Sequence, residues 1–130
     1  MSKTIVWIDD NYDVIESVVR PLKKAGYNFI YYSTAREAEE NIEEIEKADL
    51  IILDLLLATG TDDSDEEYGG IPLFTQLKNK YKIKVPIIVF TVVTKIEKLE
   101  SLRKSGVAAI VHKPIDPQRL KEVVEEALNR

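Results

Sequence analysis

The chain has 130 residues, of which 45% are hydrophobic and 32% charged, and this is the composition of one globular domain rather than of a disordered chain. The formal net charge is −5 and no apolar run is long enough to cross a bilayer, so we expect no direct nucleic-acid binding and no membrane association. The absence of cysteine excludes disulfides, thiolate metal sites and cysteine nucleophiles, and it favours a reducing, cytoplasmic location.

Short apolar runs recur along the chain and predict strands that are buried on both faces of a parallel sheet. Most of these runs are rich in β-branched or aromatic residues and are almost uninterrupted. They are Thr4 to Ile8, Phe29 to Tyr32, Leu50 to Leu53, Ile87 to Phe90 and Val107 to Val111.

Segments with apolar residues at intervals of three to four separate these runs and predict helices. Gly26 and Gly106 follow the first and fourth of them, where glycine ends a helix in the left-handed conformation. Pro21 lies inside the first pattern, so we expect a kink or an early end there. The patterns run over residues 14–22, 35–45, 73–81, 96–102 and 120–128.

Capping residues precede two of these helices. Ser33 or Thr34 can cap the second helix, with Glu37 behind it as in a capping box. Asp116 can cap the fifth helix, with Pro117 in its first turn.

Alternation of strands and helices over a single domain, residues 1–130, predicts an α/β fold with a doubly wound parallel sheet. Such sheets bind ligands outside the carboxyl ends of their strands. We therefore expect three carboxylates, one hydroxyl and one ammonium to meet at one edge of the sheet. They belong to Asp9 and Asp10 after the first strand, Asp54 after the third, Thr91 at the end of the fourth and Lys113 after the fifth.

This set of side chains suits phosphoryl chemistry. Three neighbouring carboxylates repel one another, and a hard cation such as Mg²⁺ relieves the repulsion by binding their oxygens. One carboxylate can then attack a phosphoryl group, while the cation, Lys113 and Thr91 neutralise charge on the phosphoryl oxygens. Asp54 is the best candidate for the nucleophile because it ends the central strand.

Four segments contain these residues: Trp7-Ile8-Asp9-Asp10-Asn11, Leu50-Ile51-Ile52-Leu53-Asp54, Ile87-Ile88-Val89-Phe90-Thr91 and Val111-His112-Lys113-Pro114-Ile115. In this order and at these separations they resemble the signature segments of response-regulator receiver domains. The resemblance covers essentially the whole chain. It implies a flavodoxin-like (βα)5 fold with a five-stranded parallel sheet in the order 2-1-3-4-5.

The resemblance also implies a role for the carboxylates. Asp54 would accept a phosphoryl group from a phosphohistidine of a sensor histidine kinase or a phosphotransfer protein. Mg²⁺ would bind Asp10 directly, Asp9 through water, Asp54 itself, and the backbone carbonyl of Leu56. Apart from its own phosphorylation and slow autodephosphorylation, the chain would catalyse no reaction.

The remaining implications concern the switch and its partners. Thr91 would hydrogen-bond the phosphoryl group and Lys113 would pair with it, and the bond from Lys113 to Pro114 would be cis. A stand-alone receiver would act as a phosphorelay shuttle or bind a separate downstream protein target. The fourth helix, fifth strand and fifth helix form the usual contact face of the family, which gives a phosphorylation-dependent homodimer as a further expectation.

One departure from the family pattern is an acidic run, residues 62–67, with five acids in six positions. These five acids equal the whole formal excess of negative charge. Gly69 and Gly70 come later than the family's usual glycine, so the sequence predicts an acidic insertion over residues 57–69 beside the site. A solvated loop is the plainer interpretation of the run, and a metal-binding or partner-docking loop is the alternative.

Other departures affect the switch. Val92 stands where the family usually has alanine, and Ile110 replaces the aromatic residue whose rotation usually reports phosphorylation. A signal would then pass through movement of the loop that holds Thr91. Leu56 and Val93 flank the path of the attacking water in this family, and neither side chain can orient water, so we expect a long-lived phosphoryl group.

Other classes of function stay open on the sequence alone. A pseudo-receiver would be a protein-interaction module without productive phosphorylation, which Val92, Ile110 and the insertion favour. An aspartate-nucleophile phosphatase usually has a second aspartate where Leu56 stands. Simpler structural roles also remain: Asp10 or Asn11 as helix N-caps, Thr91 as a strand end, Lys113 as a solvated loop lysine, and His112 without chemistry.

Overall fold

The computed structural model of the chain describes residues 3–57, 69–92 and 96–129. Within these ranges five strands form one parallel sheet in the order β2-β1-β3-β4-β5, which confirms the predicted fold class and strand order. The strands are β1 (Thr4–Ile8), β2 (Asn28–Tyr32), β3 (Leu50–Leu53), β4 (Ile87–Thr91) and β5 (Ala109–His112).

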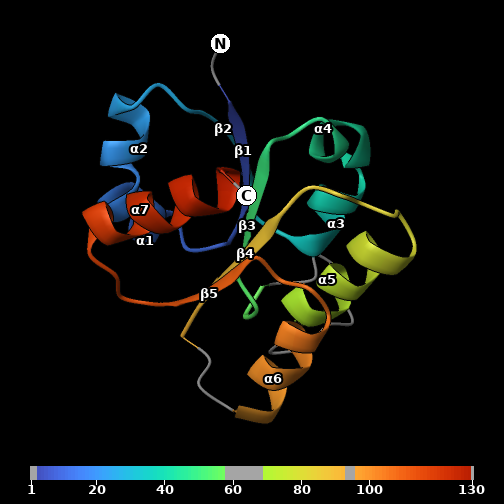
Figure 1. Cartoon of the computed structure of the whole chain (residues 1–130). Coiled ribbons are helices and arrows are strands. Elements are labelled where there is room, and N and C mark those ends of the chain that lie inside the picture. The colour runs from blue at the N-terminus through green and yellow to red at the C-terminus, as the bar shows by residue number, and fades with distance from the viewer. Residues whose placement is uncertain (1–2, 58–68, 93–95, 130) are drawn as a thin grey trace.

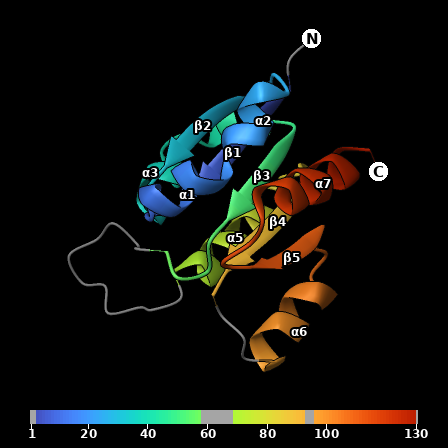
Figure 2. The ribbon, with the colours of Figure 1, turned by 90° about the vertical axis from the view of Figure 1, so that its left-hand side faces the viewer.

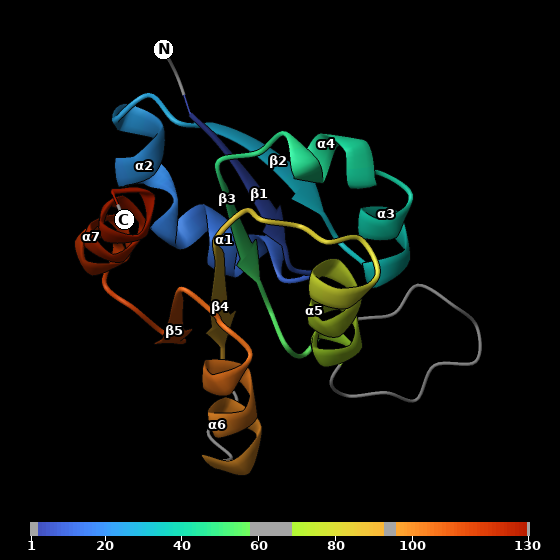
Figure 3. The same cartoon turned by 45° about the vertical axis from the view of Figure 1, so that its right-hand side comes forward.

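Helices cover both faces of the sheet, with α1, α2 and α7 on one face and α3 to α6 on the other (Figure 1 and Figure 3). Each face has its own apolar core. On β1, Ile5 and Trp7 pack toward the first group of helices, whereas Val6 and Ile8 pack toward the second. The helices are α1 (Tyr12–Val18), α2 (Arg20–Lys24), α3 (Ala35–Glu39), α4 (Ile42–Glu46), α5 (Gly70–Asn79), α6 (Ile96–Lys104) and α7 (Pro117–Leu128).

All four strand pairings are parallel, so the carboxyl ends of the strands lie along one edge of the sheet (Figure 2). The loops that follow β1, β3 and β5 all leave from this edge. The fold thereby gathers segments that are far apart in the sequence, and it does so where the sequence predicted a site.

The first predicted helix is interrupted at the expected place. Helix α1 ends at Val18, and α2 begins at Arg20 with Pro21 in its first turn. Pro21 has no N–H to donate to the carbonyl four residues earlier, so the regular helix cannot continue through it. The prediction of an early end is therefore confirmed.

The second predicted helix, over residues 35–45, is also divided, and this break was not predicted. The side-chain amide of Asn41 donates to the carbonyl oxygen of Glu37 at 2.8 Å, the acceptor that the Asn41 backbone N–H would use in a continuous helix. The Asn41 N–H donates instead to Ala38 O at 3.0 Å. Competition from this side chain ends α3 and starts α4.

Capping predictions agree with the structure. Thr34 caps α3 by accepting from the N–H of Glu37 at 3.0 Å. Asp116 caps α7 by accepting from two backbone N–H groups. Gly26 and Gly106 have φ of 95° and 90°, the left-handed conformation that was expected after the helices.

The fifth strand begins later than predicted. The apolar run from Val107 predicted a strand there, but β5 starts at Ala109, and its pairing with β4 begins opposite Ile88. The chain leaves α6 through the left-handed Gly106, and the N–H of Ala108 is the first to bond to β4, donating to Ile87 O at 2.8 Å.

Some predictions fall on residues outside the described ranges. Within the predicted acidic insertion over residues 57–69, residues 58–68 are among them, and so is Val93. Among the helices that the structure does describe, none has the length and apolar character needed to cross a membrane.

Candidate functional site

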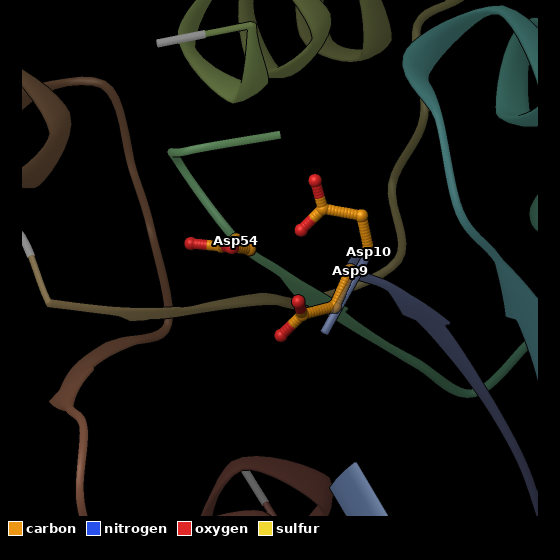
Figure 4. Close-up of side chains that lie close together, drawn as sticks. All are labelled: Asp9, Asp10 and Asp54. Atoms are coloured by element: carbon orange, nitrogen blue, oxygen red, sulfur yellow. The ribbon is translucent and has the colours of Figure 1, made fainter. Parts of the chain in front are cut away.

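Three carboxylates meet at the carboxyl edge of the sheet. Asp9 and Asp10 directly follow β1, and Asp54 directly follows the neighbouring β3, so the sheet itself brings them together (Figure 4). One oxygen from each lies within 4.8 Å of the others. Asp9 and Asp54 are buried, and Asp10 is exposed. The predicted juxtaposition of the three acids is present.

Lys113 reaches this cluster from the loop after β5. Its Nζ donates to Asp9 Oδ2 at 2.9 Å and to Asp54 Oδ2 at 3.4 Å, and its side chain is only 8% exposed. Its backbone N–H donates to the carbonyl oxygen of Thr91 at 2.9 Å, which ties the loop to the end of β4. The alternative of a solvated loop lysine is therefore wrong.

Backbone N–H groups hold the other oxygens of the two buried carboxylates. Asn11 N donates to Asp9 Oδ1 at 2.9 Å, and Leu56 N donates to Asp54 Oδ1 at 3.1 Å. Each buried carboxylate is thus bound on one oxygen by an amide and on the other by the ammonium. The N-cap of α1 is Asn11, whose side chain accepts from Val14 N at 3.4 Å.

The environment of Asp54 disfavours its charge. The pKa of Asp54 is raised from 3.8 to about 6. Burial is the larger cause, and the neighbouring Asp9 carboxylate is the second. Lys113 and the Leu56 N–H act in the opposite direction. Asp54 is therefore mainly ionised at neutral pH, but a further positive charge beside it would stabilise the ionised form.

A pocket of about 400 Å³ opens over the cluster. Its floor is acidic and its rim is largely apolar. The lining residues are Asp10, Asn11, Val14, Asp54, Leu56, Val92, Lys113 and Pro114.

Comparison with protein families agrees with this geometry. The family model of the response regulator receiver domain matches residues 5–125. The chain belongs to this family. It is therefore a receiver domain of two-component systems, a class of signalling module that is generally not enzymatic.

Two curated regulatory proteins are similar in sequence to this receiver domain. The regulatory protein VanR of Enterococcus faecium is 32% identical over 131 residues, covering 100% of this chain and 52% of VanR. The transcriptional regulatory protein CrdR of Helicobacter pylori is 26% identical over 129 residues, covering 99% and 56%. The chain thus spans about half the length of these relatives.

A solved structure agrees as well. The crystal structure of a CheY-like response regulator receiver domain protein from Methanospirillum hungatei JF-1 superposes with a TM-score of 0.78. The two chains are 25% identical, and the match covers 99% of this chain and 95% of that one.

The acidic cluster of this receiver domain fits a hard divalent cation. Receiver domains bind Mg²⁺ at an acidic site. Carboxylate oxygens are the ligands that Mg²⁺ prefers, and the exposed Asp10 leaves the cluster open to an ion that keeps part of its water. A single ammonium, that of Lys113, faces three carboxylates among the described residues, so the site retains negative charge for a cation to neutralise.

The other predicted residues differ in their position relative to the pocket. Thr91 is fully buried at the end of β4, and it is not among the described residues that line the pocket. Leu56 lines the pocket, and its carbonyl as a metal ligand stays a prediction. His112 ends β5 with an exposed side chain. The bond from Lys113 to Pro114 is cis, as the resemblance implied.

The sequence did not predict the roles of two residues that contact the site. Gly70, the first residue of α5, packs so closely on the backbone of Asp54 and Leu55 that a Cβ could not fit there. Phe90 lies beneath Lys113, with its ring centroid 5.1 Å from Nζ. The sequence shows that Phe90 directly precedes Thr91, but it does not show that Phe90 contacts Lys113, which follows β5.

Proposed function

We propose that this receiver domain accepts a phosphoryl group on Asp54 from a phosphohistidine and signals by a conformational change. The observation that carries the proposal is the buried Asp54 carboxylate, bonded to Lys113 and adjacent to two further carboxylates at the floor of an open pocket. Receiver domains interact with sensor histidine kinases or phosphotransfer proteins, and we take such a protein as the donor.

The proposed reaction is a phosphoryl transfer between two side chains. An oxygen of Asp54 attacks the phosphorus, a P–O bond forms, and the P–N bond to the donor imidazole breaks. The imidazole nitrogen keeps the electron pair and takes a proton. The product on Asp54 is an acyl phosphate, and the Lys113 ammonium neutralises one of the phosphoryl oxygens.

A bound Mg²⁺ would supply positive charge to the phosphoryl oxygens and would relieve the repulsion among the carboxylates. Asp10 would hold it directly, with Asp54, Leu56 O and water-linked Asp9 as the remaining protein contacts. The Asn11 and Leu56 N–H groups orient the Asp9 and Asp54 carboxylates for this arrangement, since each binds one carboxylate oxygen. The order of direct and water-linked ligands is part of the proposal.

Acetyl phosphate tests the proposal directly. We expect the native protein with Mg²⁺ to gain one phosphoryl group in its intact mass, and Asp54→Asn to gain none. Asp13→Asn, at an exposed position in the first turn of α1, is the control and should behave as the native protein. No gain with Mg²⁺ present would contradict the proposal.

A pseudo-receiver is the second candidate function. Val92 favours it, because this side chain is 52% exposed at the rim of the pocket where a phosphoryl donor would approach. If the native protein takes no phosphoryl group from acetyl phosphate and Val92→Ala does, Val92 prevents the reaction and this candidate is favoured. Cytoplasmic location, action as a stand-alone domain and a homodimer through α6, β5 and α7 stay predictions.

A further inference from the structure

Lys113 has an aromatic neighbour in addition to its two carboxylates. Its Nζ lies 5.1 Å from the centroid of the Phe90 ring, and both side chains are buried. An ammonium that has lost most of its water is attracted to the face of an aromatic ring by the ring's quadrupole. The ring therefore acts on the Lys113 charge without carrying a charge of its own.

Trp7 fixes the position of this ring. The Trp7 and Phe90 centroids are 5.8 Å apart with an interplanar angle of 69°, an edge-to-face contact in the core between the sheet and α1, α2 and α7. Trp7 precedes Asp9 by two residues on β1, so the strand that fixes the ring also leads to the closest partner of Lys113. Trp7 thus packs against the ring that contacts Lys113.

The Lys113 ammonium lies closer to one of its two carboxylates than to the other. Lys113 Nζ is 2.9 Å from Asp9 Oδ2 but 3.4 Å from Asp54 Oδ2, so the ion pair with Asp9 is the shorter one. The four-carbon stem of lysine is flexible, and an ion pair constrains direction weakly. The ring adds a contact to the ammonium that does not involve either carboxylate.

We propose that Phe90 is a positioning residue, whose ring holds the Lys113 ammonium over the acceptor carboxylate. The proposal rests on the proposed function, in which Lys113 neutralises the phosphoryl group on Asp54. A leucine at position 90 would fill most of the same core volume, but it has no quadrupole. Packing and positioning can therefore be separated by experiment.

Fluorinated phenylalanines make this separation, because each added fluorine weakens the quadrupole with little change in ring size. We expect monofluoro-, difluoro- and trifluorophenylalanine at position 90 of the full chain to lower the acetyl phosphate reaction rate in steps. The total loss should be roughly three- to thirty-fold. A flat series would overturn the proposal.

Phe29 provides the matched control for this series. Its ring centroid lies 6.2 Å from that of Trp7 in the same core, but on β2, which is separated from β4 by two strands of the sheet, β1 and β3. The same fluorinated residues at position 29 should leave the rate unchanged. An equal decline at both positions would indicate a packing effect and would also overturn the proposal.

NMR tests the position of Lys113 without any phosphorylation. The Phe90 ring current should shift the methylene protons next to Nζ upfield in the native protein. The shift should persist in Phe90→Tyr and Phe29→Leu and disappear in Phe90→Leu. If the native protein takes no phosphoryl group, the proposed function fails, whereas absence of the upfield shift overturns the role of Phe90.

Discussion

Leu56 and Val92 give the pocket beside Asp54 an apolar rim. Water that attacks an acyl phosphate has to be oriented by polar neighbours, and an apolar side chain offers none. Under the proposed function, this apolar environment would favour retention of a phosphoryl group on Asp54.

We predict that Leu56→Asn shortens the lifetime of phosphorylated Asp54, by about ten-fold, because an amide can orient the attacking water. The decay of the phosphorylated intact mass after removal of acetyl phosphate measures this lifetime. Leu56→Met keeps the position apolar and serves as the control. Equal lifetimes for the native protein and Leu56→Asn would show that this side chain does not limit hydrolysis.

Gly70 packs the start of α5 against the backbone of Asp54, the proposed phosphoryl acceptor. Its N–H donates to Leu55 O at 3.0 Å, and a Cβ at this position would overlap the carbonyl oxygen of Asp54 and lie 2.7 Å from Leu55 Cα. The backbone cannot yield without moving Asp54. The glycine is needed here for close approach rather than for an unusual φ.

We predict that Gly70→Ala lowers both the free energy of unfolding, by about 2 kcal/mol, and the phosphorylation rate of the folded protein. Gly106→Ala is the control, because its φ of 90° makes the substitution unfavourable although nothing lies within 4 Å of the new Cβ. It should lower stability by about 1 kcal/mol and leave the rate unchanged. Urea unfolding and the acetyl phosphate reaction measure the two effects.

At the scale of elements, local chemistry decided which predictions were correct. The caps Thr34 and Asp116 act on N–H groups two or three residues away, so the sequence contains all the information that they need. The break at Asn41 is also local, but asparagine does not end every helix that contains it, and here it does so because its side chain captures a backbone carbonyl. The choice between these outcomes is not visible in the apolar pattern.

The cap of α7 allows a prediction for this element. Asp116 accepts from Gln118 N at 3.1 Å and Arg119 N at 3.2 Å, two of the N–H groups that have no partner within the helix. Asp116→Ala should lower the free energy of unfolding by about 1 kcal/mol, as measured with urea. Asp116→Asn retains an acceptor and should lose less, and equal losses would argue against the cap.

The part of the candidate site that depends only on the order of the strands could be predicted from the sequence. Parallel strands place their carboxyl ends together, so Asp9, Asp10 and Asp54 could be grouped before any coordinates were known. The burial of Lys113 and its contact with Phe90 depend on how the loop after β5 folds back over the sheet. No periodicity in the sequence specifies that path.

At the scale of the whole molecule, the site depends on long-range contacts. Lys113 is separated by 104 residues from Asp9 and by 59 from Asp54. The carboxylates therefore meet only when the sheet has formed, and in the unfolded chain Asp54 regains an ordinary pKa. Any difference in proton binding between the two states makes stability depend on pH.

The direction in which stability changes with pH follows from the raised pKa of Asp54, which is about 6 in the folded protein and ordinarily 3.8. Between about pH 4 and 6 the folded state keeps a proton that the unfolded state releases. Raising the pH through this window therefore favours unfolding. The loss is on the order of 3 kcal/mol, and it is complete above the folded pKa.

We predict that Asp54→Asn is more stable than the native protein above pH 6 in the absence of metal, and that the difference vanishes near pH 4. The substitution removes the repulsion between Asp54 and Asp9, while Lys113 keeps its shorter bond, 2.9 Å, to Asp9. Urea unfolding with a chelator from pH 4 to 8 measures the difference, and Asp13→Asn should not reproduce it. Mg²⁺ should then stabilise the native protein more than Asp54→Asn, because only the native site retains all three carboxylates. A difference that is constant with pH would mean that Asp54 ionises without the cost that its burial implies.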